Sequence, residues 1–135
     1  MDIELNKKAV REFTKVFKNE HNVYGISHLF SKNFRHNFKA KVPPGLDGYK
    51  TIGRMMNGAF PDVVVTEEDL IAAEDKVVER SRAKATHKND FMGIPATGKK
   101  CEWTEIHIYR FDNQNKIIEH WVEASMLELV NQLKG

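Results

Sequence analysis

The stretch that most constrains the fold is residues 101–125, where side chains alternate in polarity on either side of a polar turn. Alternation with a period of two is typical of a β-strand, because successive side chains point to opposite faces of a sheet. Between the two alternating runs, the residues from Asp112 to Asn115 are of types that tolerate left-handed backbone and favour turns. The pattern predicts a long antiparallel hairpin with strands at residues 101–111 and 116–124.

Ionisable side chains gather on one face of this predicted hairpin. If the two ends of the turn pair with each other, His107 lies opposite His120. Glu105 then lies opposite Val122. The same face carries Trp103, Tyr109, Phe111, Ile118, Val122 and Ala124. Burying ionisable groups is costly unless they are paired or used, so the cluster favours a pocket. The alternative is that the histidines lie on an exposed face, or in a core where neighbouring groups satisfy them.

The first forty residues predict helices and one short strand. Asp2 can cap an amphipathic helix that carries Phe17 on its apolar side. A shorter helix is expected at residues 23–31. A strand is expected at residues 34–38, with His36 on its apolar face.

The middle of the chain predicts one more helix and a second hairpin. Asp47 can cap the helix, which follows a loop with two prolines. Strands are expected at residues 63–73 and 77–87. The polar loop at residues 88–98 is long enough to overhang a cavity mouth. A short helix is expected after the main hairpin.

The second hairpin has small residues on its inward face. Ser81, Ala83 and Ala85 alternate with basic residues, and small inward side chains leave room between the sheet and the helices. The order of elements predicts one α+β domain over residues 1–135, with helices covering one face of a curved antiparallel sheet and enclosing a pocket. A purely structural oligomerisation domain with a solid core is disfavoured by the same small residues.

Composition excludes several classes of protein. The chain has 135 residues, 41% of them hydrophobic and 30% charged, and its net charge of +2 gives no reason to expect nucleic-acid binding. The single cysteine, Cys101, excludes an internal disulfide and a cysteine-rich zinc site, which fits a reducing compartment. No apolar run approaches the ~18 residues of a membrane span, and the first residues are polar and acidic. We therefore expect a cytoplasmic protein without membrane contact.

One group of side chains has metal-binding chemistry. Imidazole and carboxylate groups are ligands for zinc and other transition metals, and His36, His107, His120 and Glu105 could in principle form such a set. Nothing in their spacing specifies a tetrahedral arrangement. We therefore expect no metal site.

Six short stretches resemble the SnoaL-like polyketide cyclases, a branch of the nuclear transport factor 2-like α+β cone. They occur in family order at residues 42–45 (VPPG), 60–62 (FPD), 75–80 (DKVVER), 86–87 (TH), 93–98 (GIPATG) and 116–121 (KIIEHW). The resemblance implies intramolecular aldol cyclisation of aromatic polyketide esters inside a hydrophobic cone, without a metal or an organic cofactor. It also implies a homodimer.

The resemblance assigns roles to individual residues. His107 falls where the cyclases keep a pocket histidine, His36 where they contact the substrate, and Phe17 at an aromatic wall position. Their acid/base aspartate would occupy the position of Val122, which cannot transfer a proton. In the predicted register Glu105 lies opposite Val122, so its carboxylate could occupy nearly the same space from the neighbouring strand.

Two functions are consistent with these observations. The first is a cofactor-independent cyclase or isomerase for a small hydrophobic or aromatic carbonyl compound, in which a base removes a proton next to the carbonyl. The catalytic residues would be His107, His120 and Glu105, and the substrate-binding residues His36, Phe17, Trp103, Tyr109, Val122 and Ile118. Since two adjacent histidines do not both stay protonated near neutral pH, one would remain available as the base. The alternative is a binding protein that keeps the cone without the chemistry.

Overall fold

The computed structural model describes residues 2–135 and contains helices and one five-stranded sheet. The helices are α1 (Ile3–Phe13), which continues into the π-helix η1 (Thr14–Asn19), the 3₁₀ turn η2 (Ser27–Leu29), α2 (Gly45–Ala59) and α3 (Met126–Lys134). The strands are β1 (Phe30–His36), β2 (Val64–Ala73), β3 (Lys76–Thr86), β4 (Lys100–Phe111) and β5 (Ile117–Ala124). No helix within residues 2–135 has the length and apolar character needed to cross a membrane.

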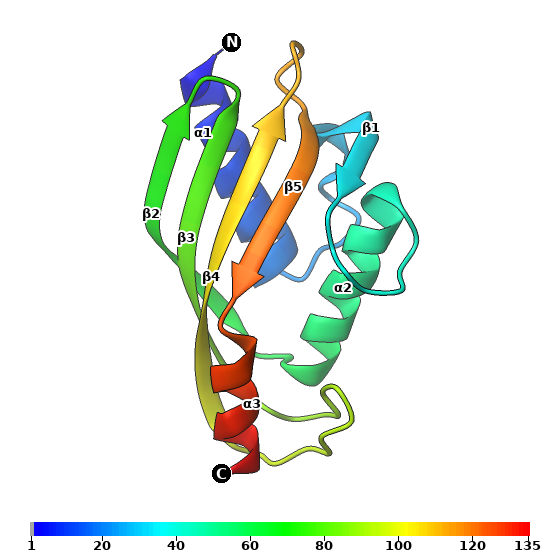
Figure 1. Ribbon diagram of the computed structural model, residues 1–135, viewed down its shortest axis with the longest axis vertical. Coiled ribbons are helices and arrows are strands. Elements are labelled where there is room, and N and C mark those ends of the chain that lie inside the picture. The colour runs from blue at the N-terminus through cyan, green and yellow to red at the C-terminus, as the bar shows by residue number, and fades with distance from the viewer. Residues whose placement is uncertain (1) are drawn as a thin grey trace.

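The sheet has the order β1-β5-β4-β3-β2 and is strongly curved, with α1 and α2 on one of its faces (Figure 1). This arrangement confirms the predicted α+β class and the helix-covered curved sheet. The predicted antiparallel pairing is confirmed for β2 to β5, while β1 runs parallel to β5 and makes the sheet mixed. The strand β1 begins at Phe30, where a helix was expected, because Phe30 and Phe34 enter the core from this edge of the sheet.

Helix starts follow local chemistry only in part. The side chain of Asp2 accepts a hydrogen bond from the backbone N–H of Leu5 at 3.0 Å, as expected of an N-cap. The helix α2 instead begins at Gly45, and its N-cap, Pro44, makes no side-chain hydrogen bond. Asp47, the predicted cap, lies in the first turn, where its charge faces the positive end of the helix dipole.

Two apolar clusters fill the interior. One lies around Phe13 and joins α1 and β1 to the end of the sheet that carries Tyr109 and Phe111. The other lies around Phe60 and Trp103 and joins the opposite end of the sheet to α3. The loop that was expected to overhang a cavity belongs to the second cluster, because its Phe91 is buried with ring centroid 5.0 Å from that of Phe60. The space beside the small residues of β3 is likewise occupied, since Ala83 packs in the cluster that contains Trp103.

The register of the main hairpin differs from the prediction by two residues. The loop holds three residues instead of two, because the N–H of Asp112 bonds to the carbonyl of Lys116 and Asn115 adopts a left-handed conformation with φ 58°. A bulge in β5 adds the second residue, since Phe111 pairs with Ile117 but Arg110 pairs with Glu119.

These two shifts move partners along the strand without changing faces. His107 therefore lies opposite Val122, and Tyr109 lies opposite His120. The predicted pairing of His107 with His120 is wrong, and so is the pairing of Glu105 with Val122, since Glu105 lies opposite Ala124. Because the side-chain period is two, an even shift returns the same residues to the inner face.

Candidate active site

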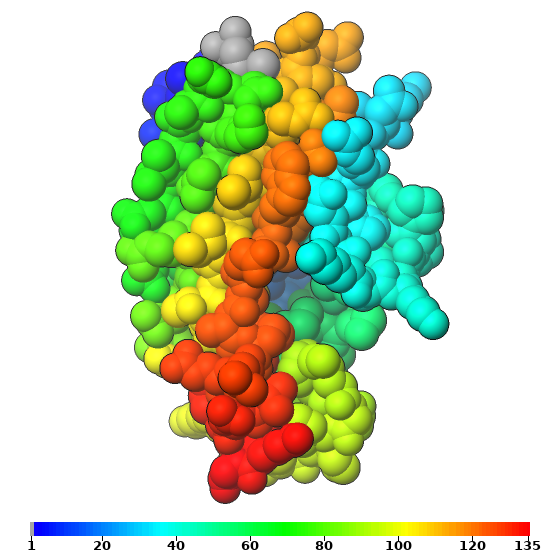
Figure 2. All heavy atoms as spheres, viewed as in Figure 1, coloured from blue at the N-terminus to red at the C-terminus, as the bar shows by residue number. Residues whose placement is uncertain are grey.

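A cavity of about 390 Å³ lies between the inner face of the sheet, η1 and α2. Figure 2 looks into a hollow bordered by β5, the segment after β1 and α2, with atoms of the N-terminal region at its bottom. The polar or ionisable residues of its wall are Lys18, Asn57, Glu105, His107 and Glu123. The remaining lining residues are Phe17, Phe38, Tyr49, Ile52, Gly53, Met56, Val63, Val65, Trp103, Val122, Ala124 and Met126.

Phe17 and α2 form one wall through an unusually close contact. A Cβ atom at Gly53 would lie 2.3 Å from Cζ of Phe17, so only glycine lets the ring rest on the helix backbone. The Phe17 ring also packs edge-on against Tyr49, with centroids 5.5 Å apart. The wall is therefore fixed by packing before any ligand enters.

Glu105 and His107 are hydrogen-bonded on the opposite wall. They are two residues apart on β4, so both side chains project from its inner face. Oε1 of Glu105 lies 2.6 Å from Nε2 of His107, and Oε2 accepts a hydrogen bond from Nε1 of Trp103 at 2.7 Å. Both carboxylate oxygens are thus held in place.

His120 lies behind His107 and is completely buried. Its Nε2 is 2.8 Å from Nδ1 of His107 and 3.0 Å from the Tyr49 hydroxyl, while its Nδ1 has no hydrogen-bond partner within the described residues. We assign the hydrogens from these contacts. Nε2 of His120 donates to Nδ1 of His107, and Nε2 of His107 donates to Glu105.

The pKa shifts agree with this assignment. Burial lowers the pKa of both histidines, and the ammonium of Lys18 lowers them further, so each is neutral at pH 7. Burial alone would raise the pKa of Glu105, but the hydrogen bonds from His107 and Trp103 and the nearby positive charge of Lys18 hold it at about 2. The pair therefore consists of an anionic carboxylate and a neutral imidazole.

Lys18 and Glu79 form a second polar group beside the cavity. Glu79 lies on the inner face of β3, directly opposite His107 in the register, and is completely buried. It accepts hydrogen bonds from Thr14 Oγ1 at 2.8 Å and from Lys18 Nζ at 3.3 Å. Lys18 Nζ also donates to the Tyr109 hydroxyl at 3.2 Å. The π-helix η1 directs both Thr14 and Lys18 toward the sheet.

The structure brings together some of the predicted site residues. Of the predicted catalytic residues, Glu105 and His107 line the cavity, and His120 reaches it only through His107. Of the predicted substrate-binding residues, Phe17, Trp103 and Val122 line it. These are positions only, and the roles of these residues stay predictions.

Three predicted substrate-binding residues do not line the cavity. His36 bonds instead to the backbone of the following loop, with Nε2 2.8 Å from the carbonyl oxygen of Pro43. Tyr109 is buried behind the wall under Lys18. Ile118 is the extra residue of the β5 bulge, so Ile117 takes the inward place that the prediction gave to Ile118.

The sequence interpretation missed Lys18, Glu79 and the contact of Tyr49 with His120. Extending the alternation of Ser81, Ala83 and Ala85 by two residues would have placed Glu79 inside. No sequence signal marks the π-helix that turns Lys18 inward.

The cavity has no evident metal ligand set. Within residues 2–135 no three His, Cys, Asp or Glu side chains are grouped so that they could hold a metal ion. His36 lies outside the hydrogen-bonded group formed by Glu105, His107 and His120.

Comparisons with known proteins match nearly the whole chain. A family model described as SnoaL-like polyketide cyclase covers residues 7–133. AclR from Streptomyces galilaeus, named as a candidate hydroxylase, is 25% identical with a TM-score of 0.87 over 98% of both chains. TsrD from Streptomyces laurentii is 26% identical with a TM-score of 0.88 over 98% of this chain and 97% of that chain. A candidate polyketide cyclase from Acidithiobacillus ferrooxidans is 28% identical with a TM-score of 0.84 over 99% of this chain and 98% of the other. A search of curated proteins gave no match.

Proposed function

Because this chain belongs to the SnoaL-like polyketide cyclase family, we propose that it is an enzyme that needs no cofactor and moves a proton next to the carbonyl of a small hydrophobic compound. The reaction would be an aldol cyclisation or an isomerisation. The observation that carries the proposal is the anionic Glu105, held by His107 on the wall of a largely apolar cavity. A fixed carboxylate in such a cavity is suited to general base catalysis.

Glu105 is the proton acceptor in this proposal. The C–H bond next to the carbonyl breaks and its electron pair forms a carbon–carbon double bond, the π pair of the carbonyl moves onto the oxygen, and the proton goes to a carboxylate oxygen. The low pKa of Glu105, about 2, makes it a weak base. A bound hydrophobic ligand displaces water from the carboxylate, and this loss of solvation raises its pKa toward the range needed for catalysis.

His107 and His120 position the carboxylate. Nδ1 of His107 is occupied by the hydrogen from His120, so neither imidazole presents a bare nitrogen to the cavity. The earlier hypothesis placed the base on the histidine pair, with Glu105 as its assistant. The roles are the reverse, because among these three residues only Glu105 has unshared electron pairs that can reach a ligand.

A second candidate function is ligand binding without catalysis, and Val122 favours it. Val122 lies on the cavity wall opposite His107, where the resemblance implies the acid/base aspartate of the cyclases. If Glu105 does not replace that aspartate, the cavity still binds apolar molecules.

The test is hydrogen–deuterium exchange at the carbon next to the carbonyl of 2-tetralone in D₂O, followed by NMR. We expect the protein to accelerate exchange and Glu105→Gln to slow it by at least ~10²-fold, the usual contribution of a positioned base. Glu123→Gln is the matched control, because Glu123 also borders the cavity but has an exposed side chain.

The control variant should exchange at the wild-type rate. Binding of 2-tetralone is measured in parallel by quenching of the tryptophan fluorescence, because Trp103 lines the cavity. If the protein binds the ketone but does not accelerate exchange, the proposed enzyme activity is wrong and ligand binding without catalysis is supported. A gain of exchange in Val122→Asp, in a protein that otherwise only binds, would point the same way.

A further inference from the structure

The geometry points to Lys18 as the group that stabilises the negative charge developing on the substrate oxygen. This inference rests on the proposed function for its chemistry, and on the cavity geometry for its location. It implies a substrate whose carbonyl oxygen contacts Lys18 while the neighbouring acidic carbon faces Glu105.

Lys18 is buried at the cavity but keeps one hydrogen available. Its side chain is 10% exposed and forms part of the cavity wall. An ammonium group has three hydrogens. Two are used by Glu79 and Tyr109, at 3.3 and 3.2 Å, and no third acceptor lies within hydrogen-bonding distance in the described part of the chain. The third hydrogen is therefore free for a ligand oxygen.

The position of Lys18 is fixed before a ligand arrives. Glu79 is held by Thr14 at 2.8 Å and carries the charge that balances the ammonium. The ammonium also lies 5.7 Å from the centroid of the Phe13 ring and 5.9 Å from that of Tyr109. A donor whose position is fixed in a site that excludes water stabilises developing charge without reorganisation.

The positive charge of Lys18 stabilises the transition state more than the ground state. Before reaction, the negative charge of the reacting pair resides on Glu105. After proton transfer Glu105 is neutral and the charge is on the substrate oxygen, beside Lys18. The attraction between Lys18 and the substrate oxygen therefore grows during the reaction, which is the condition for catalysis.

The probe is 4-nitrophenol, a planar oxygen acid whose ionised form absorbs visible light. The bound fraction that is ionised is measured spectroscopically across pH, so the readout needs no turnover. We expect Lys18→Met to reduce the ratio of ionised to neutral bound probe at least ~10-fold. Loss of one oxyanion donor lowers kcat by roughly 10²–10³-fold in enzymes that use one. Glu79→Gln should increase the ratio of ionised to neutral probe, because it removes the competing anion.

The matched control is Lys15→Met, because Lys15 lies on the same π-helix with an exposed side chain. It should leave the ionisation of the bound probe unchanged. If Lys18→Met does not fold, as judged by circular dichroism, Glu79→Gln is compared with the double variant Lys18→Met/Glu79→Gln, in which no buried charge of the pair is left alone. Equal ionisation of the probe with and without Lys18 would overturn the inference.

The two proposals fail separately. If Glu105→Gln loses exchange while Lys18→Met leaves the ionisation of bound 4-nitrophenol unchanged, Glu105 remains the proton acceptor and the oxyanion role of Lys18 is wrong. If Lys18→Met changes the ionisation of bound 4-nitrophenol but the wild-type protein catalyses no exchange, Lys18 is an oxyanion-binding residue and the proposed function is wrong.

Discussion

The two faces of the strands β3 and β4 carry similar ionisable residues in opposite surroundings. Glu79 and Glu105 point inward, while Arg80, Arg82 and Glu102 point outward from neighbouring positions. On both faces carboxylates are paired with basic groups. The difference between the faces is therefore burial.

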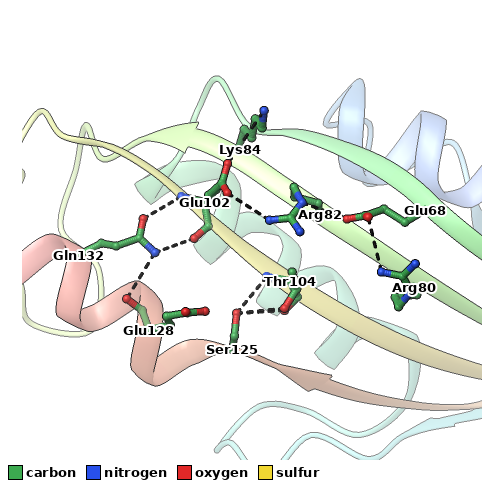
Figure 3. Close-up of polar contacts among 9 residues, drawn as sticks. All are labelled: Glu68, Arg80, Arg82, Lys84, Glu102, Thr104, Ser125, Glu128 and Gln132. Atoms are coloured by element: carbon green, nitrogen blue, oxygen red, sulfur yellow. Dashed lines mark hydrogen bonds and ion pairs between the residues drawn. The ribbon is translucent and has the colours of Figure 1, made fainter.

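The outer face forms a ladder of exposed ion pairs. Arg82 bridges Glu68 and Glu102 at 3.0 and 3.1 Å, and Arg80 pairs with Glu68 (Figure 3). Arg80 also pairs with Asp69. All these side chains keep a substantial exposed fraction, so water already solvates each charge. Such pairs contribute little to stability.

The inner face holds fewer charges, each fixed by several hydrogen bonds. Glu79 has no exposed surface and depends on Thr14 and Lys18 for all its hydrogen bonds. A charge on this sheet therefore affects stability and chemistry in proportion to the water it has lost. We expect large effects on stability from inward substitutions and small effects from outward ones.

The largest effect is expected from Glu79→Ala. Removing one partner of a buried pair leaves the ammonium of Lys18 without its counter-charge, which costs about 3–5 kcal/mol of the free energy of unfolding. Urea denaturation at neutral pH measures it. Glu68→Ala is the outward control and should cost only a small fraction of that amount. Equal losses in the two variants would show that burial does not set the contribution of these charges to stability.

The next effect is a fall in stability at mildly acidic pH. His107 and His120 have lowered pKa values in the folded protein, so below pH ~6.5 the unfolded chain binds protons that the folded protein does not. Their contribution is complete above this pH and is lost as the pH falls. Between pH 7.5 and 5.5 we expect a loss of about 2 kcal/mol in the free energy of unfolding.

Glu105 does not contribute to this change. Because its pKa is about 2, its contribution is lost only at much lower pH. The double variant His107→Gln/His120→Gln should remove most of the pH dependence, whereas His28→Gln, at an exposed position, should retain it. A pH dependence that survives in the double variant would assign it to other groups.

The smallest effect is expected from Arg82→Gln on the outer face. Its exposed pairs with Glu68 and Glu102 contribute less than ~1 kcal/mol, and salt screens them. The difference in urea midpoint between this variant and the wild type should disappear at ~1 M NaCl. The cost of Glu79→Ala should persist at the same salt concentration, because the buried pair is not screened. A salt-resistant loss in Arg82→Gln would contradict the assignment of these pairs to the solvated surface.

Features that depend on local pattern could be predicted from the sequence. Alternation placed Trp103, Glu105 and His107 on one inner face, and the helical spacing around Phe17 gave the first helix, because both periodicities follow from backbone geometry. The family could also be recognised from short matching stretches, and the family model confirms it.

Features that depend on tertiary contacts could not be predicted. The sequence of the loop around Asn115 is compatible with two or three residues, and the bulge at Ile118 is set by how β5 packs between β1 and β4. The inward turn of Lys18 requires a π-helix whose stabilising partner, Glu79, is 61 residues away.

The number of extra residues in the hairpin loop and the β5 bulge decides which side chains of β5 face inward: an even number keeps the same set, and an odd number exchanges it. Each feature adds one residue, and either one alone would turn His120 and Val122 outward and bring Glu119 and Trp121 to the cavity side of β5. Two together leave every inward residue inward. Changes of length in this hairpin are therefore compatible with the site only in even steps, whether both residues come from the loop or one comes from each feature. A lineage that lost or gained a single residue here would exchange His120 and Val122 for a different set of side chains on an otherwise unchanged sheet.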